Sequence, residues 1–343
     1  MKTYYTFNDI FLIPQLTDCE SRSLIDTSTS IGTIDLNAPI MSANMDTITG
    51  PDMAIAMSRA GGTSALHRFN SDNEAVEEYL KVCEYGADCF VSVGVNDLNL
   101  TRATSLYEAG ARHFIVDIAH GHSSMMRHTL KILRNTFGST IFIVAGNVAT
   151  PEAVRDLASW GADSIKVGIG GGSCCSTRVI TGHGVPMFSC LLECSEEADK
   201  HNVSIIADGG LRSSGDIIKA LAAGADYVMI GSLLSGTTET PGIVIDSSSG
   251  PVKQFRGMAS TAAMIDRNHR SKADMPVGEG VKTVVPFKGP AENIIKDLHS
   301  GIRSGMSYMN AHTLSEIPIV ARWGAQTSAG SFEGRPHILG DTV

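Results

Sequence analysis

The feature that most constrains this 343-residue chain is a repeated alternation of short apolar runs and helix-like stretches. Eight runs predict buried strands, at residues 38–45, 62–66, 89–93, 114–118, 141–145, 164–169, 204–207 and 227–230. Amphipathic segments between them predict helices, at residues 51–60, 75–85, 98–109, 125–136, 151–160, 191–201 and 214–223. Strands that are apolar on both faces and alternate with helices are typical of parallel α/β sheets. Eight such units favour a TIM (β/α)8 barrel, and a doubly wound sheet is the alternative.

The segment after the eighth predicted strand departs from this alternation. Residues 237–288 are rich in Ser, Thr, Gly and charged residues and are too long for a plain connection. We expect a mobile flap here, within a single domain that spans residues 1–343. A last helix over 290–304 would close the barrel, and the polar tail 325–343 is expected to be flexible or ordered by a neighbouring subunit.

Charge and hydropathy exclude several classes of protein. The formal net charge of −9 disfavours binding to nucleic acids or to anionic membranes. The N-terminus has no apolar signal core, and no apolar stretch approaches the ~18 residues of a membrane span, so we expect a cytoplasmic protein. The chain has seven cysteines, which is an odd number, and none of them shows the spacing of a zinc site. We therefore expect reduced thiols.

Polar residues gather where the predicted strands end. In a TIM barrel these C-terminal ends share one rim, which carries the functional groups. The rim would hold Asn44, Asp46, His67, Arg68, Asp117, His120, His122, Asn147, the loop 168–178, Asp208 to Gly210, Gly231 and Ser232. Any one of these residues is explained as a strand cap or a turn, but the whole set predicts an active site.

The loop 168–178 is the most informative part of this rim. It reads Gly-Ile-Gly-Gly-Gly-Ser-Cys-Cys-Ser-Thr-Arg. Its glycines let backbone N–H groups approach an anion, or let carbonyl groups converge on a cation. A thiolate at Cys174 or Cys175, beside these N–H groups and Arg178, would be stabilised and nucleophilic. The alternative is that Cys174 and Cys175 are only two small packing residues in an unconstrained loop, which the local sequence would also fit.

Two further rim segments have specific chemical interpretations. The turns after the seventh and eighth strands lie where TIM barrels commonly hold phosphate, with Asp208 able to accept hydrogen bonds from ribose hydroxyls. Plain turns have the same composition. Segment 117–123 contains one carboxylate and two histidines, which is compatible with a metal site. A loop facing a cofactor is the favoured interpretation, because histidines at i and i+2 converge on a metal only in an unusual loop.

The loop 168–178 resembles the cysteine loop of IMP dehydrogenases and GMP reductases, which usually reads G-I-G-P-G-S-x-C-T-T-R. Matches to this family continue at 7–14, 42–47, 117–123, 145–148, 207–216, 257–258, 279–280 and 303–308. The resemblance covers nearly the whole chain. It implies a cytoplasmic oxidoreductase of purine metabolism that binds GMP or IMP and a nicotinamide cofactor and forms a homotetramer.

The resemblance also implies roles for individual positions. Cys175 matches the nucleophile that attacks C2 of the purine, and Thr177 and Glu279 match the residues that relay protons. The substrate side is matched by Ser42, Ser173, Asp208, Gly209, Gly210, Gly231, Ser232, Gly257 and Met258. The cofactor side is matched by Asp117, Asn147 and Gly168. Gly170, Gly172 and Cys175 match the loop whose backbone carbonyls hold a monovalent cation, K⁺ or Na⁺.

This chain departs from the family pattern inside the loop itself. Gly171 replaces the usual proline, so we expect a floppier loop. Cys174 and Ser176 replace a common apolar residue and a threonine. The assignment of the attacking thiol to Cys175 therefore rests on alignment.

Three features of the sequence favour the reductase over the dehydrogenase. The regulatory modules commonly inserted after the second strand are absent, since Leu66 runs directly into the next helix. The flap carries Asp266-Arg267-Asn268-His269 where the dehydrogenase has Asp-Arg-Tyr, whose arginine activates water. Phe255 stands where the dehydrogenase usually has tyrosine.

Other segments support the dehydrogenase. Residues 207–234 and 256–258 look more like that enzyme, and Arg267 or Arg270 could activate water. We expect a GMP reductase, which converts GMP to IMP and ammonia with NADPH. The alternatives are an IMP dehydrogenase without regulatory modules, which converts IMP to XMP with NAD, and a non-catalytic purine-nucleotide-binding protein.

Overall fold

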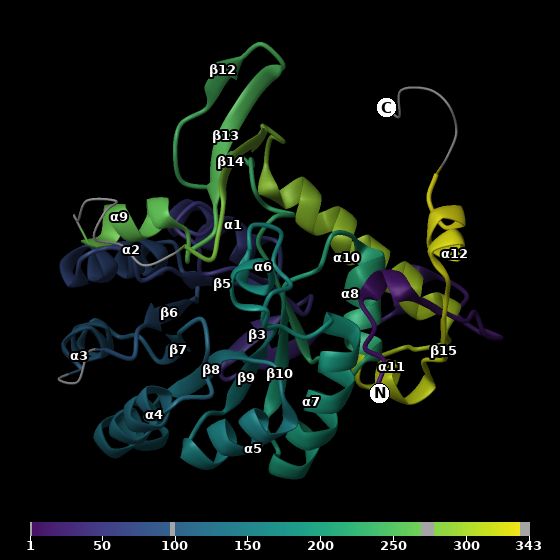
Figure 1. Cartoon of the computed structure of the whole chain (residues 1–343), viewed down its shortest axis with the longest axis horizontal. Coiled ribbons are helices and arrows are strands. Elements are labelled where there is room, and N and C mark those ends of the chain that lie inside the picture. The colour runs from purple at the N-terminus through teal and green to yellow at the C-terminus, as the bar shows by residue number, and fades with distance from the viewer. Residues whose placement is uncertain (1, 97–99, 269–277, 337–343) are drawn as a thin grey trace.

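Eight parallel strands close into a barrel in the computed structural model, which describes residues 2–96, 100–268 and 278–336 (Figure 1). The barrel strands are β4 (Ile40–Ser42), β5 (Thr63–Leu66), β6 (Phe90–Val93), β7 (His113–Asp117), β8 (Phe142–Val148), β9 (Ser164–Val167), β10 (Ser204–Asp208) and β11 (Tyr227–Ile230). Each coincides with a predicted run. Strand β11 pairs with β4 and closes the ring, which confirms the TIM barrel and excludes the doubly wound sheet.

Helices follow the strands and surround the barrel (Figure 1). They are α1 (Pro51–Arg59), α2 (Asp72–Glu84), α3 (Thr101–Glu108), α4 (Ser124–Phe137), α5 (Pro151–Trp160), α7 (Met187–His201), α8 (Ser214–Ala222) and α10 (Ala291–Tyr308). Helix α2 begins three residues before its predicted start because Ser71 and Glu74 form a capping box. A short helix that the sequence analysis did not predict, α6 (Thr177–Thr181), follows the cysteine loop.

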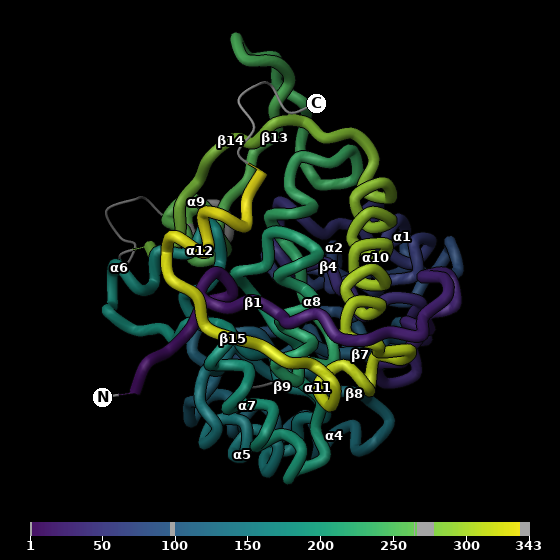
Figure 2. Tube along the Cα trace, turned by 90° about the vertical axis from the view of Figure 1, so that its right-hand side faces the viewer, coloured from purple at the N-terminus to yellow at the C-terminus, as the bar shows by residue number. Residues whose placement is uncertain are grey.

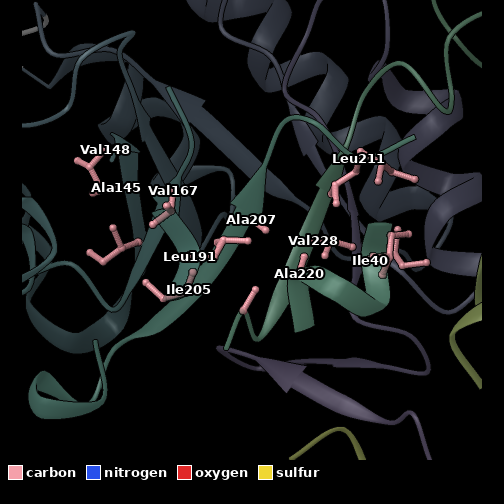
Figure 3. Packing of buried hydrophobic residues seen from close by; sticks show 14 of the residues in the cluster. Ile40, Ala145, Val148, Val167, Leu191, Ile205, Ala207, Leu211, Ala220 and Val228 are labelled. Carbon is pink, nitrogen blue, oxygen red and sulfur yellow. The ribbon is translucent and has the colours of Figure 1, made fainter. Parts of the chain in front are cut away.

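The core is aliphatic and lies on both faces of the barrel wall. Ile205 and Ala207 belong to the layer between barrel and helices, whereas Ile206 belongs to the barrel interior. Figure 3 shows part of the outer layer, where Leu191 of α7 and Ala220 of α8 pack with strand residues. The hairpin of β2 (Thr29–Ile31) and β3 (Ile34–Leu36) contributes Ile31, Ile34 and Leu36 to the inner cluster. This two-sided burial explains why the strands read as continuous apolar runs.

The predicted flap contains regular structure. Strands β12 (Ile245–Ser247), β13 (Gly250–Arg256) and β14 (Lys282–Pro286) form an antiparallel sheet that projects from the barrel, and α9 (Thr261–Asn268) follows β13 (Figure 1). Arg256 pairs with Asp46 at 3.0 Å, which ties the base of this sheet to the loop after β4. Arg270 and the side chain of Arg267, considered above for water activation, lie outside the described residues.

The C-terminal tail differs from the prediction as far as residue 336. Strand β15 (Trp323–Ala325) pairs antiparallel with β1 (Ile10–Leu12), and the two lie side by side across one flank of the molecule (Figure 2). The short helices α11 (Ile317–Val320) and α12 (Ser328–Glu333) lie on either side of β15 in the chain. Contacts within the same chain hold the start of the tail, since the N–H of Gln326 donates to the carbonyl of Asp9 and its Nε2 donates to the carbonyl of Asn8, each at 2.7 Å.

None of the helices in the described part of the chain has the length and apolar character needed to span a membrane.

Candidate active site

A cavity of about 860 Å³ opens where the barrel strands end, walled by their C-terminal residues, the cysteine loop and the base of the flap. Predicted site residues from all three regions line it. They are Asp117, Asn147, Gly168, Gly170, Gly172, Ser173, Cys175, Thr177, Asp208, Gly209, Gly210, Gly231, Ser232, Gly257, Met258 and Glu279. The fold therefore brings together residues that are more than 160 positions apart in the sequence.

Ser42 is the exception among the predicted site residues. It is fully buried in β4, and its hydroxyl accepts a hydrogen bond from Thr49 at 2.9 Å. It is not among the residues that line the cavity. The expectation that Ser42 binds the substrate directly therefore needs correction, because its side chain points into the protein and already has a partner there.

The two cysteines of the loop have different surroundings. Cys175 is exposed, and its Sγ donates a hydrogen bond to Thr177 Oγ1 at 3.0 Å. Cys174 is only 6% exposed, and burial raises the pKa of its thiol. A nucleophilic cysteine must be accessible and able to ionise. These surroundings favour Cys175 over Cys174 as the attacking thiol.

Backbone hydrogen bonds hold Glu279 beside the cysteine loop. The N–H of Ser176 donates to the carbonyl of Glu279 at 2.9 Å, and the N–H of Val281 donates to the carbonyl of Cys174 at 3.0 Å. Gly257 approaches the same loop so closely that a Cβ there would lie 3.0 Å from the Cys174 carbonyl oxygen. Cys175, Thr177 and Glu279 thus line the same cavity and offer a thiol, a hydroxyl and a carboxylate, a set suited to nucleophilic attack with proton relay.

Arg178 is not among the residues that line the cavity, although the sequence predicted its cation beside the thiol. Its Nη2 donates to the carbonyl of Val185 at 2.6 Å. Its side chain passes so close to Gly170 and Gly184 that a Cβ on either would lie within 2.7 Å of Arg178 Cγ. The aliphatic part of the Arg178 side chain therefore packs against the backbone of the loop, and glycine is needed at 170 and 184 because a Cβ there would clash with it.

A buried group of charged and polar side chains lines the opposite part of the cavity. This charge cluster consists of Lys166, Asp117, Asp208, Asn147 and Arg68. Lys166 Nζ donates to Asp208 Oδ2 at 2.8 Å and to Asn147 Oδ1 at 2.5 Å, and it lies 3.4 Å from Asp117 Oδ1. Asn147 Nδ2 donates to Asp208 Oδ2 at 2.9 Å, and Arg68 Nε lies 3.4 Å from Asp117 Oδ2.

Lys166 and Asp117 of the charge cluster stay ionised despite burial. Burial by itself lowers the pKa of Lys166, but the carboxylates of Asp208 and Asp117 outweigh it and hold that pKa above its ordinary value. Burial likewise raises the pKa of Asp117, yet Lys166 and Arg68 outweigh it and hold that pKa below its ordinary value. The cluster therefore presents fixed charges at neutral pH.

No role was predicted for Lys166 from the sequence. The only signal was a single lysine inside an otherwise apolar or small-residue strand, Ser164–Val167. Its three acceptors, Asp117, Asn147 and Asp208, lie on three other strands, so no local sequence motif could predict these contacts.

Comparison with known proteins identifies the family. A model described as "IMP dehydrogenase / GMP reductase domain" matches residues 4–337. The chain belongs to the IMP dehydrogenase / GMP reductase family. Members of this family are oxidoreductases that use nicotinamide cofactors.

Relatives within the family carry both names. The chain is 32% identical to an inosine-5′-monophosphate dehydrogenase of Nitrosopumilus maritimus, over 97% of this chain and 98% of that protein. It is 43% identical to a GMP reductase of Leishmania donovani, over 72% of this chain and 52% of that protein. The crystal structure of a variant GMP reductase from Trypanosoma brucei in complex with guanosine 5′-monophosphate superimposes with a TM-score of 0.92 at 29% identity, over 99% of both chains.

The cavity fits the nicotinamide cofactor that family members use. Besides the charge cluster, which includes the cation of Arg68, its lining includes Phe69, Asn96 and Met125, which offer an amide and apolar surface. Its volume lies near the upper end of the ~300–1,000 Å³ typical of ligand pockets, which suits a nucleotide and a second ligand. Ionised Asp117 could accept hydrogen bonds from cofactor hydroxyls.

The structure does not assemble a metal site from segment 117–123. His122 pairs with Asp156 of α5 at 3.0 Å, while Asp117 faces Lys166. Among the described residues, no group of three or more His, Cys, Asp or Glu side chains could hold a metal ion. The monovalent-cation site at the carbonyls of Gly170, Gly172 and Cys175 stays a prediction.

Proposed function

We propose that this protein is a GMP reductase, which converts GMP to IMP and ammonia with NADPH. The observation that carries the proposal is the exposed thiol of Cys175, 3.0 Å from the Thr177 hydroxyl and beside the Glu279 segment. The reductase is favoured over the dehydrogenase by Phe255. It is 4% exposed and lines the cavity where the dehydrogenase usually has a tyrosine hydroxyl.

The reaction begins with attack of the Cys175 thiolate on C2 of the guanine base, which forms a C–S bond. The thiol proton passes to Thr177 and Glu279, which return a proton to the exocyclic amine so that it leaves as ammonia. Bound NADPH supplies the hydride that C2 then accepts. Breaking of the C–S bond restores the Cys175 thiolate and releases IMP.

The other side of the cavity supplies binding for the nucleotide. Asp208 can accept hydrogen bonds from the ribose hydroxyls through Oδ1, because Oδ2 already binds Lys166 and Asn147. Gly209 and Gly210 have φ of +105° and +78°, a backbone conformation that favours glycine and turns the chain sharply after β10. With Gly231 and Ser232 they form the proposed phosphate cradle.

The second candidate is an IMP dehydrogenase. Several relatives that match nearly the whole chain carry that name, among them the Nitrosopumilus protein and one from Cryptosporidium parvum that is 35% identical. The same cysteine chemistry serves both reactions, but the dehydrogenase also needs a group that activates water.

One experiment separates the candidates. Absorbance at 340 nm is followed with GMP plus NADPH, and separately with IMP plus NAD, each with a Cys175→Ala control. A fall in the first mixture that the control lacks supports the reductase. A rise only in the second assigns the dehydrogenase. Nucleotide binding without either change means a non-catalytic protein, and NADH in place of NADPH measures cofactor preference.

We further propose a cytoplasmic homotetramer that binds K⁺ or Na⁺ through the carbonyls of Gly170, Gly172 and Cys175. Light scattering on the purified protein measures the assembly. Turnover in KCl, NaCl and choline chloride of equal ionic strength measures the cation requirement, and equal rates in all three would contradict it.

A further inference from the structure

Lys166 lies between the two ligand sides of the cavity. Its side chain is 3% exposed, and its ammonium group has three hydrogens. Three acceptors surround it: Asp208 Oδ2, Asn147 Oδ1 and Asp117 Oδ1, at 2.8, 2.5 and 3.4 Å. Asp208 belongs to the proposed substrate side, and Asp117 and Asn147 belong to the proposed cofactor side. All hydrogens of Lys166 are thus directed to the protein groups that would hold the ligands.

Gly146 lets strand β8 approach β9 closely at the position of Lys166. A Cβ on Gly146 of β8 would lie 2.6 Å from both Cβ and the carbonyl oxygen of Lys166. Only glycine at 146 leaves that space open.

Stability alone does not account for a buried cation here. Replacing a buried ion pair with well-packed apolar residues is often neutral or stabilising, because desolvation of the charges offsets their attraction. The other residues of β9 show that small and apolar side chains suit this strand. A lysine whose partners all line the cavity points to a role in the site.

We propose that Lys166 is a positioning residue that binds the ribose-side carboxylate of Asp208 and the cofactor-side carboxylate of Asp117 through one buried cation. Both ligand sides then depend on the same group, through the carboxylates that it binds. This inference rests on the proposed function only for the assignment of the two sides.

The first test is the Lys166→Met variant, which removes the charge and keeps a similar volume. Binding of GMP, IMP and NADP⁺, each alone, is measured by titration calorimetry. Loss of charge-assisted hydrogen bonds is expected to weaken both nucleotide and cofactor binding by about tenfold or more. Unchanged affinities, or a loss confined to one side, would overturn the proposal.

Lys253→Met is the matched control. Lys253 is also buried, 2% exposed, and its Nζ donates to the carbonyls of Thr237, Thr238 and Thr240. It does not line the cavity. The control is expected to lose thermal stability while keeping its affinity for all three ligands.

Chemical rescue distinguishes a charge that positions from a side chain that only fills space. In Lys166→Ala, propylammonium is expected to restore GMP affinity severalfold, whereas 1-propanol at the same concentration is not. Equal rescue by both compounds, or rescue by neither in a folded variant, would contradict the proposal. This variant also decides the matter if Lys166→Met does not fold.

The outcomes separate this inference from the proposed function. Intact nucleotide binding with no reductase turnover overturns the proposed function alone, because the Lys166 test uses IMP as well as GMP. Wild-type protein that binds neither nucleotide overturns both.

Discussion

The two sides of the cavity are built in different ways. The cysteine-loop side is made largely of backbone, since glycines leave room for Arg178 and for neighbouring segments of the chain, and the thiol of Cys175 is exposed. The charge cluster is made of side chains from several strand ends that bind one another and are largely shielded from water. The first side is suited to bond making, where a nucleophile must be accessible. The second is suited to holding polar ligands with charges fixed in advance.

The largest expected effect lies on the loop side. Replacement of Cys175 by alanine should lower turnover by more than about 10⁴-fold, because no other accessible thiol among the described residues lines the cavity to form the covalent adduct. GMP binding, measured by calorimetry, should change little. Cys174→Ala is the control and should keep near-normal turnover, since Cys174 is buried. The assignment is wrong if the two variants exchange these behaviours.

The next largest effect, on the free energy of unfolding, is expected at Gly168, where the cysteine loop passes the backbone of Asp208. Gly168 has a φ of +144°, and a Cβ there would lie 1.9 Å from the Asp208 carbonyl oxygen. Gly168→Ala should lower the free energy of unfolding by about 3 kcal/mol or prevent folding, through strain and overpacking. Urea denaturation measures it. Gly172→Ala, whose nearest contact would be an ordinary 3.5 Å, should cost less than about 1 kcal/mol. Equal losses would contradict a steric requirement at 168.

A smaller effect, on cofactor affinity, is expected at Arg68, which lies at the cofactor end of the charge cluster, whereas Lys166 lies at its centre. Arg68 contacts only Asp117 within the cluster, and both side chains are partly exposed, so the pair contributes about 1 kcal/mol at most. Arg68→Met should weaken NADP⁺ binding up to about fivefold and leave GMP binding in the absence of cofactor unchanged. Lys81→Met, which breaks an exposed pair with Asp52, is the control. An equal loss of GMP affinity would show that Arg68 acts on both sides.

The smallest expected effect is on stability in acid. The pKa of Asp117 is held below its ordinary value of 3.8, so its contribution to stability is present above that pH. The contribution is lost as the pH falls from 3.8 through the lower value of the folded state. The difference in unfolding free energy between wild type and Asp117→Asn should therefore shrink below about pH 4. Asp35→Asn, at an exposed position in a hairpin, should show no such trend. A constant difference across this pH range would argue against an ionised, paired Asp117.

Much of the barrel could be predicted because local patterns specify it. Continuous apolar runs predicted all eight strands. Helix ends were predicted less closely: α2 begins three residues early at the Ser71 cap, and α7 begins four residues early, at Met187, without a side-chain cap. The flap sheet and the pairing of β15 with β1 were missed. Both depend on antiparallel partners, which sequence periodicity does not identify when the strands are short and exposed.

The candidate site was predictable to the extent that it follows strand ends. Rim position, the cysteine loop and the family resemblance located all the predicted site residues that line the cavity, but not the part of its wall formed by Asn70, Gly94, Val95, Asn96 and Met125. They did not reveal that Ser42 points into the protein, that Arg178 packs against the backbone of the loop, or that Lys166 joins Asp117 to Asp208. These facts depend on side-chain direction and on contacts between strands.

The sequence by itself determined the closed barrel, the rim that carries the site and the loop that contains the thiol, because each follows from residues near one another in the chain. Only the tertiary structure decided which cysteine is exposed and how the buried charges pair. Strand register brings Lys166 to its partners on β7, β8 and β10, and distances of a few ångströms decide whether a buried charge is stabilised or excluded.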